Sequence, residues 1–339
     1  MSTSYRISVV IPTYQRCASV ERALSALAHQ TYPADQFEVI VSIDGSDDST
    51  GVMAANFPAA FHRQVLWQPR RGRAAACNAG IRAAKGDLVI LLDDDMEPAP
   101  EFLAAHQQTH LKASRVGVVG GAPIAFGPSS PPVLRYIGAK FNQHLEKLAM
   151  PGHQISFREF YSGNFSLSRA LILQCGLFDE RFKIYGNEDG ELALRLINAG
   201  IKLSYCAAAM AHQHYEKNFA ALARDNIAKG RTAVLLARKH PDTFQSLKLS
   251  TFQQGSRKWR LLRTGLLELS RLFPTLPKFV ISSMGWLERY EPARLNDYYI
   301  LALDYFYWLG ARSALSEEPQ VNHERTSWQE RLEKPWFGQ

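Results

Sequence analysis

The stretch Leu88-Val89-Ile90-Leu91-Leu92-Asp93-Asp94-Asp95 joins an apolar run to three consecutive acids. The apolar run predicts a strand buried on both faces of a parallel sheet. Ligands of open α/β sheets collect at the carboxyl ends of such strands. Three adjacent carboxylates repel one another, so this position favours a cation such as Mg²⁺ or Mn²⁺, with substrate phosphates completing its shell. The alternative is an acidic turn in which one Asp caps a helix that starts near Pro98.

The composition is that of a globular protein with a large core. The chain has 339 residues, 46% of them hydrophobic and 21% charged, which allows one big domain or two. Its four cysteines are far apart and form no C-x-x-C pair, which argues against a zinc knuckle or a disulfide frame and favours a reducing compartment. The apolar run from Ile7 to Pro12 is too short for a secretory signal. The sequence therefore predicts a cytoplasmic protein.

The positive charge lies in the C-terminal part. Between Lys217 and Arg312 there are 16 Lys or Arg and 7 Asp or Glu, a net charge of +9, whereas the rest of the chain carries −2. This excess favours an anionic partner, either a lipid surface or a phosphorylated acceptor; a solvated basic face is the alternative. Lys258, Arg260 and Arg263 alternate with leucines, a pattern typical of a helix on an anionic membrane and also of a helix packed on the protein. No nucleic acid is expected, because no recognition motif accompanies the charge.

Strand and helix patterns alternate over the first 120 residues, as in a doubly wound, mainly parallel α/β sheet. The predicted strands are Arg6–Ile11, Glu38–Ile43, Gln64–Gln68, Leu88–Leu92, Val116–Gly120, Asn164–Leu167 and Lys202–Cys206. The predicted helices are Ala18–His29, Ser49–Phe57, Arg73–Ala84, Pro100–Lys112, Val133–Leu148 and Glu188–Ala199. From Glu216 onward the sequence is mostly helical. We expect a domain over 1–240, a basic helical region over 241–319 and a tail over 320–339.

The first two predicted strands end in polar residues. Pro12 is expected to stop the strand ladder, so that Thr13 to Arg16 form a lip over the carboxyl edge of the sheet. Asp44, at the tip of the second strand, is placed to hydrogen-bond a ribose or a base edge. The residues that follow, 46–49, could instead form only a turn and a helix N-cap. The fingerprint G-x-G-x-x-G is absent from the first turn, which argues against a dinucleotide enzyme.

Arginines begin the third predicted helix and acids begin a later one. Arg70, Arg71 and Arg73 are disfavoured at a helix N-terminus unless an anion lies nearby, although each could simply be exposed. Asp189 shares its helix face with apolar residues three, four and seven positions on, so it is expected to face the interior or a cleft, as a general base would. Glu191 and Arg195 are expected to form an exposed pair.

His212 and His214 follow the last short strand. In extended structure both imidazoles face the same side and could reach one metal site, although ordinary packing is an alternative.

Taken in order, these motifs resemble the family 2 glycosyltransferases, which have the GT-A fold. The likeness covers roughly residues 5 to 240. The matching stretches are Val10-Ile11-Pro12-Thr13-Tyr14, Ile43-Asp44-Gly45-Ser46, Asn78-Ala79-Gly80-Ile81, Gly86-Asp87 with Asp93-Asp94-Asp95, Gly163-Asn164-Phe165-Ser166, and Gly176-Leu177-Phe178-Asp179-Glu180 with Tyr185-Gly186-Asn187-Glu188-Asp189.

The resemblance implies a role for each matched residue. The implied metal ligands are Asp93, Asp95 and His212, with His214 as the alternative. The implied donor contacts are Pro12, Thr13, Arg16, Asp44, Arg71, Arg73, Asn78, Asp93 and Asp94, of which Asp94 faces away from the metal or touches the sugar. Gly163, Asn164 and Glu188 lie on the implied acceptor side, and Asp189 matches the catalytic base.

The implied reaction is inverting transfer of one sugar from a nucleoside-diphosphate sugar, a UDP-sugar being favoured, to a hydroxyl of a glycan or a lipid-linked acceptor. It would depend on Mn²⁺ or Mg²⁺, and the protein could attach peripherally to the inner face of the plasma membrane. Two departures from the family matter. Cys77 stands where many relatives have arginine, so that diphosphate contact falls to Arg71 or Arg73. The Q-x-x-R-W signature of processive synthases is broken in Gln254-Gly255-Ser256-Arg257-Lys258-Trp259, which favours single addition.

Two other functions remain open from the sequence. A sugar-phosphate nucleotidyltransferase is also an α/β enzyme with acidic metal ligands, but it would need a Gly-rich basic loop after the first strand. A non-catalytic membrane- or carbohydrate-binding scaffold could keep the fold, but it would need none of Asp93, Asp95 and Asp189.

Overall fold

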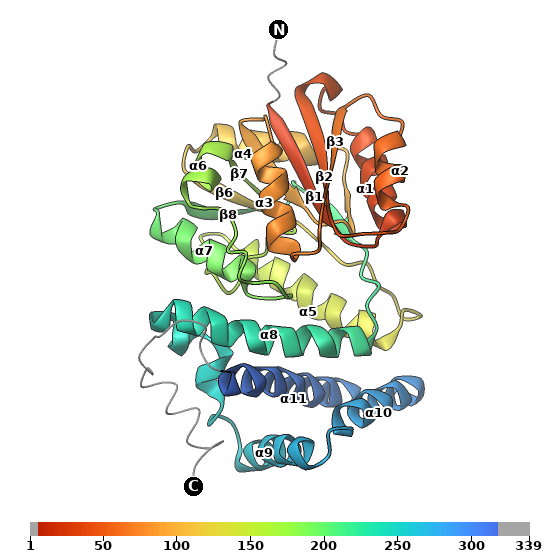
Figure 1. The fold of residues 1–339 in the computed structure, drawn as a ribbon, viewed down its shortest axis with the longest axis vertical. Helices are drawn as coiled ribbons and strands as arrows, with labels where there is room; N and C mark the ends of the chain where they lie inside the picture. Colours follow the sequence, from red (N-terminus) through yellow and green to blue (C-terminus); the bar gives the residue numbers. More distant parts are fainter. Residues whose placement is uncertain (1–5, 318–339) are drawn as a thin grey trace. The chain divides into compact units, whose positions relative to one another are not determined.

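The computed structural model describes residues 6–317 of the chain, so the predicted tail over 320–339 lies outside the described residues. These residues form two compact units (Figure 1). Within the described residues, the first unit consists of 6–130, 135–183 and 188–216, and the second of 131–134, 184–187 and 217–317.

A seven-stranded sheet forms the centre of the first unit, in the order β3-β2-β1-β4-β7-β6-β8. Its strands are β1 (Ile7–Thr13), β2 (Phe37–Asp44), β3 (His62–Gln68), β4 (Leu88–Leu92), β6 (Val116–Gly120), β7 (Asn164–Ser168) and β8 (Lys202–Cys206). Only β7 runs antiparallel to its neighbours, β4 and β6. The mainly parallel α/β sheet expected from the sequence is therefore confirmed.

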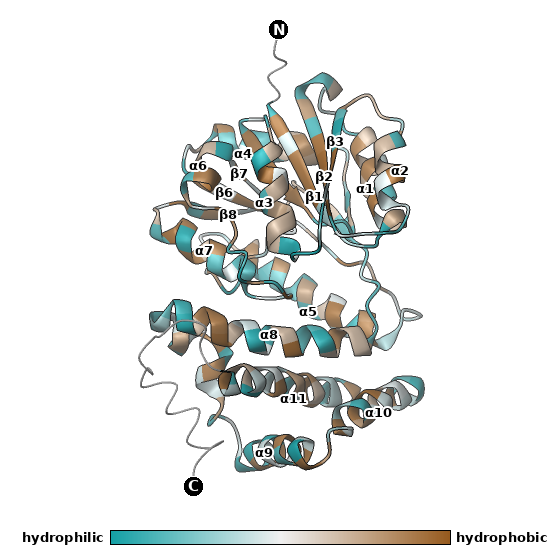
Figure 2. Cartoon of the chain, in the orientation of Figure 1, coloured by the Kyte–Doolittle hydropathy of each residue, from teal (hydrophilic) through white to brown (hydrophobic). Residues whose placement is uncertain are grey.

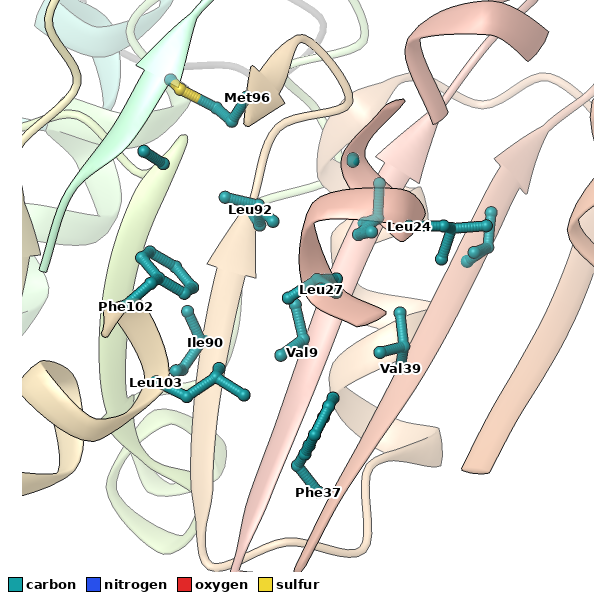
Figure 3. Close-up of a cluster of buried hydrophobic side chains, with 14 of the residues drawn as sticks. Val9, Leu24, Leu27, Phe37, Val39, Ile90, Leu92, Met96, Phe102 and Leu103 are labelled. Atoms are coloured by element: carbon teal, nitrogen blue, oxygen red, sulfur yellow. The ribbon is translucent and has the colours of Figure 1, made fainter. Parts of the chain in front are cut away.

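Helices cover both faces of this sheet. In the first unit they are α1 (Cys17–Ala28), α2 (Thr50–Asn56), α3 (Arg73–Ala83), α4 (Phe102–Leu111), α6 (Arg169–Gln174) and α7 (Glu188–Asn198); α5 (Pro132–Leu148) begins in the second unit and continues in the first, and a short 3₁₀ helix spans Ala34–Gln36. Leu24 of α1 and Phe102 of α4 pack on one face with Val9 and Ile90 (Figure 3). Helices α3, α6 and α7 pack on the other face.

The small residues of α3 bring this helix close to the sheet. A Cβ atom on Gly80 would lie 2.3 Å from Cγ1 of Val10 in β1, so only glycine fits there. The close fit fixes α3 against β1 and thereby places Arg73, at the start of the helix, near the carboxyl edge of the sheet.

The structure differs from the sequence prediction at three places in these elements. Pro12 was expected to end the strand, but the pairing of β1 with β2 continues through Pro12 to Thr13. The pairing of β1 with β4 does end earlier, at Val10. Two three-residue strands, β5 (Met96–Pro98) and β9 (Ala211–Gln213), form a separate antiparallel sheet that was not expected, and α6 was also missed.

The Glu191–Arg195 pair forms as expected, but the prediction that the pair is exposed was wrong. The Glu191 side chain is fully buried and the Arg195 side chain is 22% exposed. Arg195 also donates hydrogen bonds to the carbonyl oxygens of Cys175 and Leu177, which fixes it against the loop before α7 and away from solvent.

The described part of the second unit is helical. Its elements are α8 (Phe219–Lys239), α9 (Arg257–Leu272), α10 (Leu276–Tyr290), α11 (Leu295–Ser316) and two 3₁₀ helices (Pro241–Ser246, Lys248–Thr251). Helices α8 and α11 approach very closely: a Cβ atom on Gly230 would lie 1.9 Å from the Tyr307 carbonyl oxygen, and one on Gly310 equally close to that of Ile227. No helix among residues 6–317 is long and apolar enough to cross a membrane.

Candidate active site

Three strands of the first unit end in the polar residues that the sequence singled out. Thr13 ends β1, Asp44 ends β2, and Asp93 follows β4 directly. These strands are parallel neighbours, so their carboxyl ends meet at one edge of the sheet.

The Arg73 guanidinium joins two acids at this edge. Its Nη2 and Nε atoms lie 2.5 and 3.0 Å from Oδ1 of Asp93, and its Nη1 lies 3.3 Å from Oδ1 of Asp189, which opens α7. Burial opposes the charge on Arg73, but Asp93 and Asp189 outweigh it and raise the pKa of the guanidinium well above its usual value. All three side chains are 25% to 31% exposed, so the cluster is open to solvent.

Ser162 is a member of this cluster that the sequence analysis missed. Its hydroxyl donates to Oδ1 of Asp189 at 2.5 Å and accepts from Nη1 of Arg73 at 3.1 Å, while its backbone N–H donates to Oδ2 of Asp189 at 3.3 Å. Asp189 therefore faces this shared cluster, as expected for a residue on the inner face of α7. The acid that is fully enclosed is its neighbour Glu188, which is 4% exposed.

Gly163 places the backbone directly against the acidic triplet. Its carbonyl oxygen accepts from the backbone N–H of Asp93 at 2.8 Å, and a Cβ atom on Gly163 would lie 2.4 Å from Oδ2 of Asp93. The next residue, Asn164, turns inward: its amide donates to the carbonyl oxygens of Gly121 and Ala209 and its oxygen contacts the His106 ring. The buried Asn164 side chain therefore fixes the backbone beside Asp93.

The imidazoles behind Asn164 are uncharged. Burial lowers the pKa of His106 to about 3 and that of His110 to about 4, against hydrogen bonds that oppose the shift. Both rings contact the Ser166 hydroxyl at 2.8 Å. This polar chain is one more feature that holds β7 in place, and no sequence motif indicated it.

Asp94 points toward the end of β1. It accepts from the Thr13 hydroxyl at 2.7 Å and lies 3.9 Å from Nη1 of Arg16. Burial raises the pKa of Asp94 to about 7, although Arg16 and the Thr13 hydroxyl lower it. Thr13, Arg16 and Asp94 thus lie together, and Pro12 is buried in the strand just before them. Their contact with the donor stays a prediction.

Asp44 supports the loop that leads into α3. Its carboxylate accepts from the backbone N–H groups of Arg71 and Gly72, both at 2.8 Å, and from the Gln68 side chain at 2.9 Å. These bonds fix the turn that sets the direction of Arg73. The Arg71 side chain leaves the cluster instead and pairs with Glu180 at 2.6 Å.

Asn78 and Cys77 lie one turn further along α3, and both are buried. The Asn78 amide donates to the Phe178 carbonyl oxygen at 2.9 Å and to Glu180 at 3.0 Å, so it braces the segment before α7. Burial raises the pKa of the Cys77 thiol to about 12, so this residue is not a thiolate nucleophile.

Within residues 6–317, His212 and His214 form no metal-holding group with the acidic triplet. The His212 side chain is exposed, and Nε2 of His214 lies 2.6 Å from Oε2 of Glu97. The segment does reach the triplet through Asp95, whose backbone oxygen accepts from His214 N–H at 2.8 Å. Across residues 6–317 no group of three or more His, Cys, Asp or Glu side chains is arranged to hold a metal. The metal-ligand roles of Asp93, Asp95 and His212 therefore stay predictions.

Comparisons with known proteins agree on one class of enzyme. The family model "Glycosyl transferase family 2" matches residues 8–175, and a model for the "N-terminal domain of galactosyltransferase" matches residues 143–217. A validoxylamine A glucosyltransferase of Streptomyces hygroscopicus subsp. jinggangensis is 30% identical, over 58% of this chain and 53% of its own length. The chain thus spans about half the length of this curated relative.

Solved structures show the same fold. A mannosyltransferase of Pyrobaculum calidifontis, determined with GDP-Man and Mn²⁺, superposes with a TM-score of 0.54 at 19% identity, covering 89% of this chain and 87% of that one. TarS of S. aureus, determined with UDP-GlcNAc, has a TM-score of 0.54 at 15% identity, covering 94% and 95%. The GT-A fold is thereby confirmed, and the glycosyltransferase is favoured over a nucleotidyltransferase or a scaffold. The chain belongs to the family 2 glycosyltransferases.

Proposed function

We propose that this glycosyltransferase is an inverting enzyme that moves one sugar from a nucleoside-diphosphate sugar to a hydroxyl of a glycan or a lipid-linked acceptor. The observation that supports this most directly is the bridge from Asp93 through Arg73 to Asp189. It brings an acid from the tip of β4 and an acid from the start of α7 to one solvent-reachable point. One acid is then available on the donor side and the other on the acceptor side.

On the donor side, Arg73 is the arginine that can meet the diphosphate. It occupies the first turn of α3, where backbone N–H groups also attract anions, whereas Arg71 is held by Glu180. Thr13, Arg16 and Asp44 would line the nucleoside pocket. A UDP-sugar is the donor we favour, and a GDP-sugar is the alternative, because fold relatives were determined with UDP-GlcNAc and with GDP-Man.

The acidic triplet suits a divalent cation in its chemistry. Asp93 and Asp95 carry hard oxygen ligands, and the guanidinium now held by Asp93 shows that this position attracts a positive charge. Asp93 and Asp95 would hold Mn²⁺ or Mg²⁺, with His212 as a further proposed ligand and His214 as its alternative. When bound, the ion would supply positive charge for the departing diphosphate.

On the acceptor side, Asp189 is the proposed general base. It would take the proton of the acceptor hydroxyl as that oxygen attacks the anomeric carbon, which inverts the configuration. Ser162 holds the Asp189 carboxylate through its hydroxyl and its N–H group, so the base is oriented before an acceptor arrives. Gly163, Asn164 and Glu188 would shape this side of the site. No enzyme nucleophile is needed, in agreement with the raised pKa of Cys77.

The location and domain roles are proposals as well. Cys17, Cys77, Cys175 and Cys206 are all unpaired thiols, which supports a cytoplasmic, reducing location. We propose that residues 1–240 carry the transfer reaction and that the basic region over 241–319 serves a separate role in attachment.

The proposal is tested by the release of nucleoside diphosphate from a panel of UDP- and GDP-sugars, with Asp189→Asn as the main variant. Loss of a positioned base should lower turnover by about 10²- to 10⁴-fold. Donor binding should change little, because the amide keeps the shape of the side chain. Asp87→Asn, at the exposed opposite end of β4, makes the same chemical change as a control and should keep normal turnover. Unimpaired turnover by Asp189→Asn would exclude this residue as the base.

A further inference from the structure

Helices α9 and α10 of the second unit present large apolar side chains to solvent. Leu261, Leu272, Phe279 and Tyr290 are 64% to 73% exposed. A single exposed residue of this kind is ordinary, but several on two consecutive helices call for an explanation. We call the following residues the apolar face: Leu261, Leu262, Leu269, Leu272, Phe273, Phe279, Trp286 and Tyr290. Figure 2 shows hydrophobic and hydrophilic residues interleaved along both helices.

The spacing of these residues forms continuous stripes. On α9, Leu262 and Leu269 are seven residues apart and therefore share one side of the helix, and the exposed Phe273 follows at its C-cap. On α10, Phe279, Trp286 and Tyr290 are separated by seven and four residues, and the rings of Trp286 and Tyr290 lie 4.6 Å apart between centroids. Each helix thus carries an ordered apolar stripe on its outer side.

The inner side of α9 already has its own partners, so the apolar face is not a core surface. Leu267 is fully buried, and Nε of Arg263 lies 2.7 Å from Oδ2 of Asp304 in α11. The Arg263 guanidinium also lies 5.5 Å from the centre of the Trp308 ring. The sequence left open whether Arg263 faces a membrane or packs on the protein; the structure turns it inward.

Exposed basic residues lie on the same two helices as the apolar face. Between Arg257 and Tyr290 there are seven Lys or Arg and two Glu. Both acids have partners within the unit: Glu268 lies 3.3 Å from Nη1 of Arg312, and Glu288 accepts from the Tyr299 hydroxyl at 2.6 Å. The exposed basic residues on the two helices are Arg257, Lys258, Arg271, Lys278 and Arg289.

We propose that the apolar face docks on an anionic lipid bilayer surface. Tryptophan, phenylalanine and leucine side chains would enter the boundary between headgroups and acyl chains, and the basic residues would meet the lipid phosphates. A protein partner would bury the apolar residues equally well, but the excess of exposed Lys and Arg on the same two helices favours a surface of uniform negative charge. The proposal concerns attachment and does not depend on which sugar is transferred.

Flotation of the full chain with vesicles tests the charge requirement. With equal parts of phosphatidylglycerol and phosphatidylcholine the protein should float, and with phosphatidylcholine alone it should not. Each exposed Lys or Arg near the surface should contribute roughly fivefold to partitioning. The combined variant Lys258→Glu, Lys278→Glu and Arg289→Glu should therefore lose about a hundredfold or more. Raising the salt concentration should weaken binding by the wild-type protein.

The apolar requirement needs its own variant and a matched control. Phe279→Glu with Trp286→Glu should reduce partitioning by about tenfold or more, because two buried aromatic contacts are lost. Leu111→Glu changes a leucine that is 79% exposed, at the end of α4 in the first unit, and should float like the wild type. Far-UV circular dichroism would verify that all variants keep the fold.

Insertion itself can be measured by quenching tryptophan fluorescence with lipids brominated in their acyl chains. Quenching should fall in Trp286→Phe and persist in Trp67→Phe, since Trp67 is a comparably exposed tryptophan on β3 of the first unit. Equal flotation of the Phe279→Glu, Trp286→Glu variant and the wild type would overturn the proposal. So would sedimentation showing a dimer that these same substitutions dissociate, because the apolar face would then join two copies of the chain.

Discussion

The Arg73 guanidinium lies between carboxylates that come from distant parts of the sequence. Asp93 is 20 residues away and Asp189 is 116 residues away, yet both share this one cation. A positive charge that already balances the acids can also meet the diphosphate of a donor, since a planar guanidinium suits phosphate oxygens. Substitutions at Arg73 can therefore test the proposed diphosphate contact separately from the proposed roles of Asp93 and Asp189.

Arg73→Gln should weaken donor binding by about 10- to 100-fold, because a charge-assisted contact is lost. Arg73→Lys keeps the charge but not the fork of donors, so it should recover only part of the affinity. Titration calorimetry with the nucleoside diphosphate measures both. Arg82→Gln, in the last turn of the same helix, is the control and should bind normally. Equal affinity for Arg73→Gln and the wild type would assign the diphosphate contact to another residue.

Single residues differ in how far the sequence could place them. Asp93 and Asp189 were predicted from motifs at the ends of regular elements, and the structure brings both to Arg73. Ser162 was missed because a hydroxyl in a loop has no periodic pattern that marks it. Asn78 and Asn164 were expected at the donor and the acceptor, but their side chains bond the backbone of neighbouring segments. A motif indicates that a residue matters without telling whether it touches the substrate.

At the scale of elements, the long periodic segments were predicted well. Strands Leu88–Leu92, Val116–Gly120 and Lys202–Cys206 match the structure to the residue. The strands β5 and β9 were missed, since three residues are too few to show an alternating pattern. The close crossing of α8 and α11 was also not predicted, because it depends on two glycines 80 residues apart, each of which meets the backbone of the other helix only in the folded chain.

This crossing makes Gly230 and Gly310 sensitive positions. Gly230→Ala or Gly310→Ala would place a methyl group against a backbone carbonyl oxygen, and each should destabilise the second unit by about 1–3 kcal/mol. Gly265→Ala on α9 and Gly285→Ala on α10 meet nothing within 4 Å and should stabilise by about 0.4–1 kcal/mol. Urea denaturation measures all four. A stabilising Gly230→Ala would contradict the close packing of these helices.

At the scale of the whole molecule, charge is divided between the parts of the chain. The sequence predicted a basic C-terminal part, and the structure adds which residues face solvent and which, like Arg263, are turned inward. The distinction could not be made from the sequence, because leucines occur on both the inner and the outer side of α9. The proposed cation and donor sites, in contrast, lie among the acids of the first unit.

Ligand-linked stability of the whole chain tests the proposed metal. Mn²⁺ together with a nucleoside diphosphate should raise the melting temperature more than either alone. Saturation at a hundred times the dissociation constant corresponds to about 2.7 kcal/mol. Asp95→Ala should remove the Mn²⁺-dependent part of this shift, and Asp87→Asn should keep it. If Asp95→Ala and the wild type respond alike to Mn²⁺, Asp95 is not a metal ligand.

The absence of a side chain at Gly163 limits how this sequence can vary. Any other amino acid would place a carbon 2.4 Å from an Asp93 carboxylate oxygen, so even a methyl group would displace the acid or the β4 tip that carries it. Gly127, by contrast, faces open space, and its backbone is not in the left-handed conformation that favours glycine. In a library of random substitutions, alanine should therefore be depleted at position 163 under selection for sugar transfer and accepted at position 127.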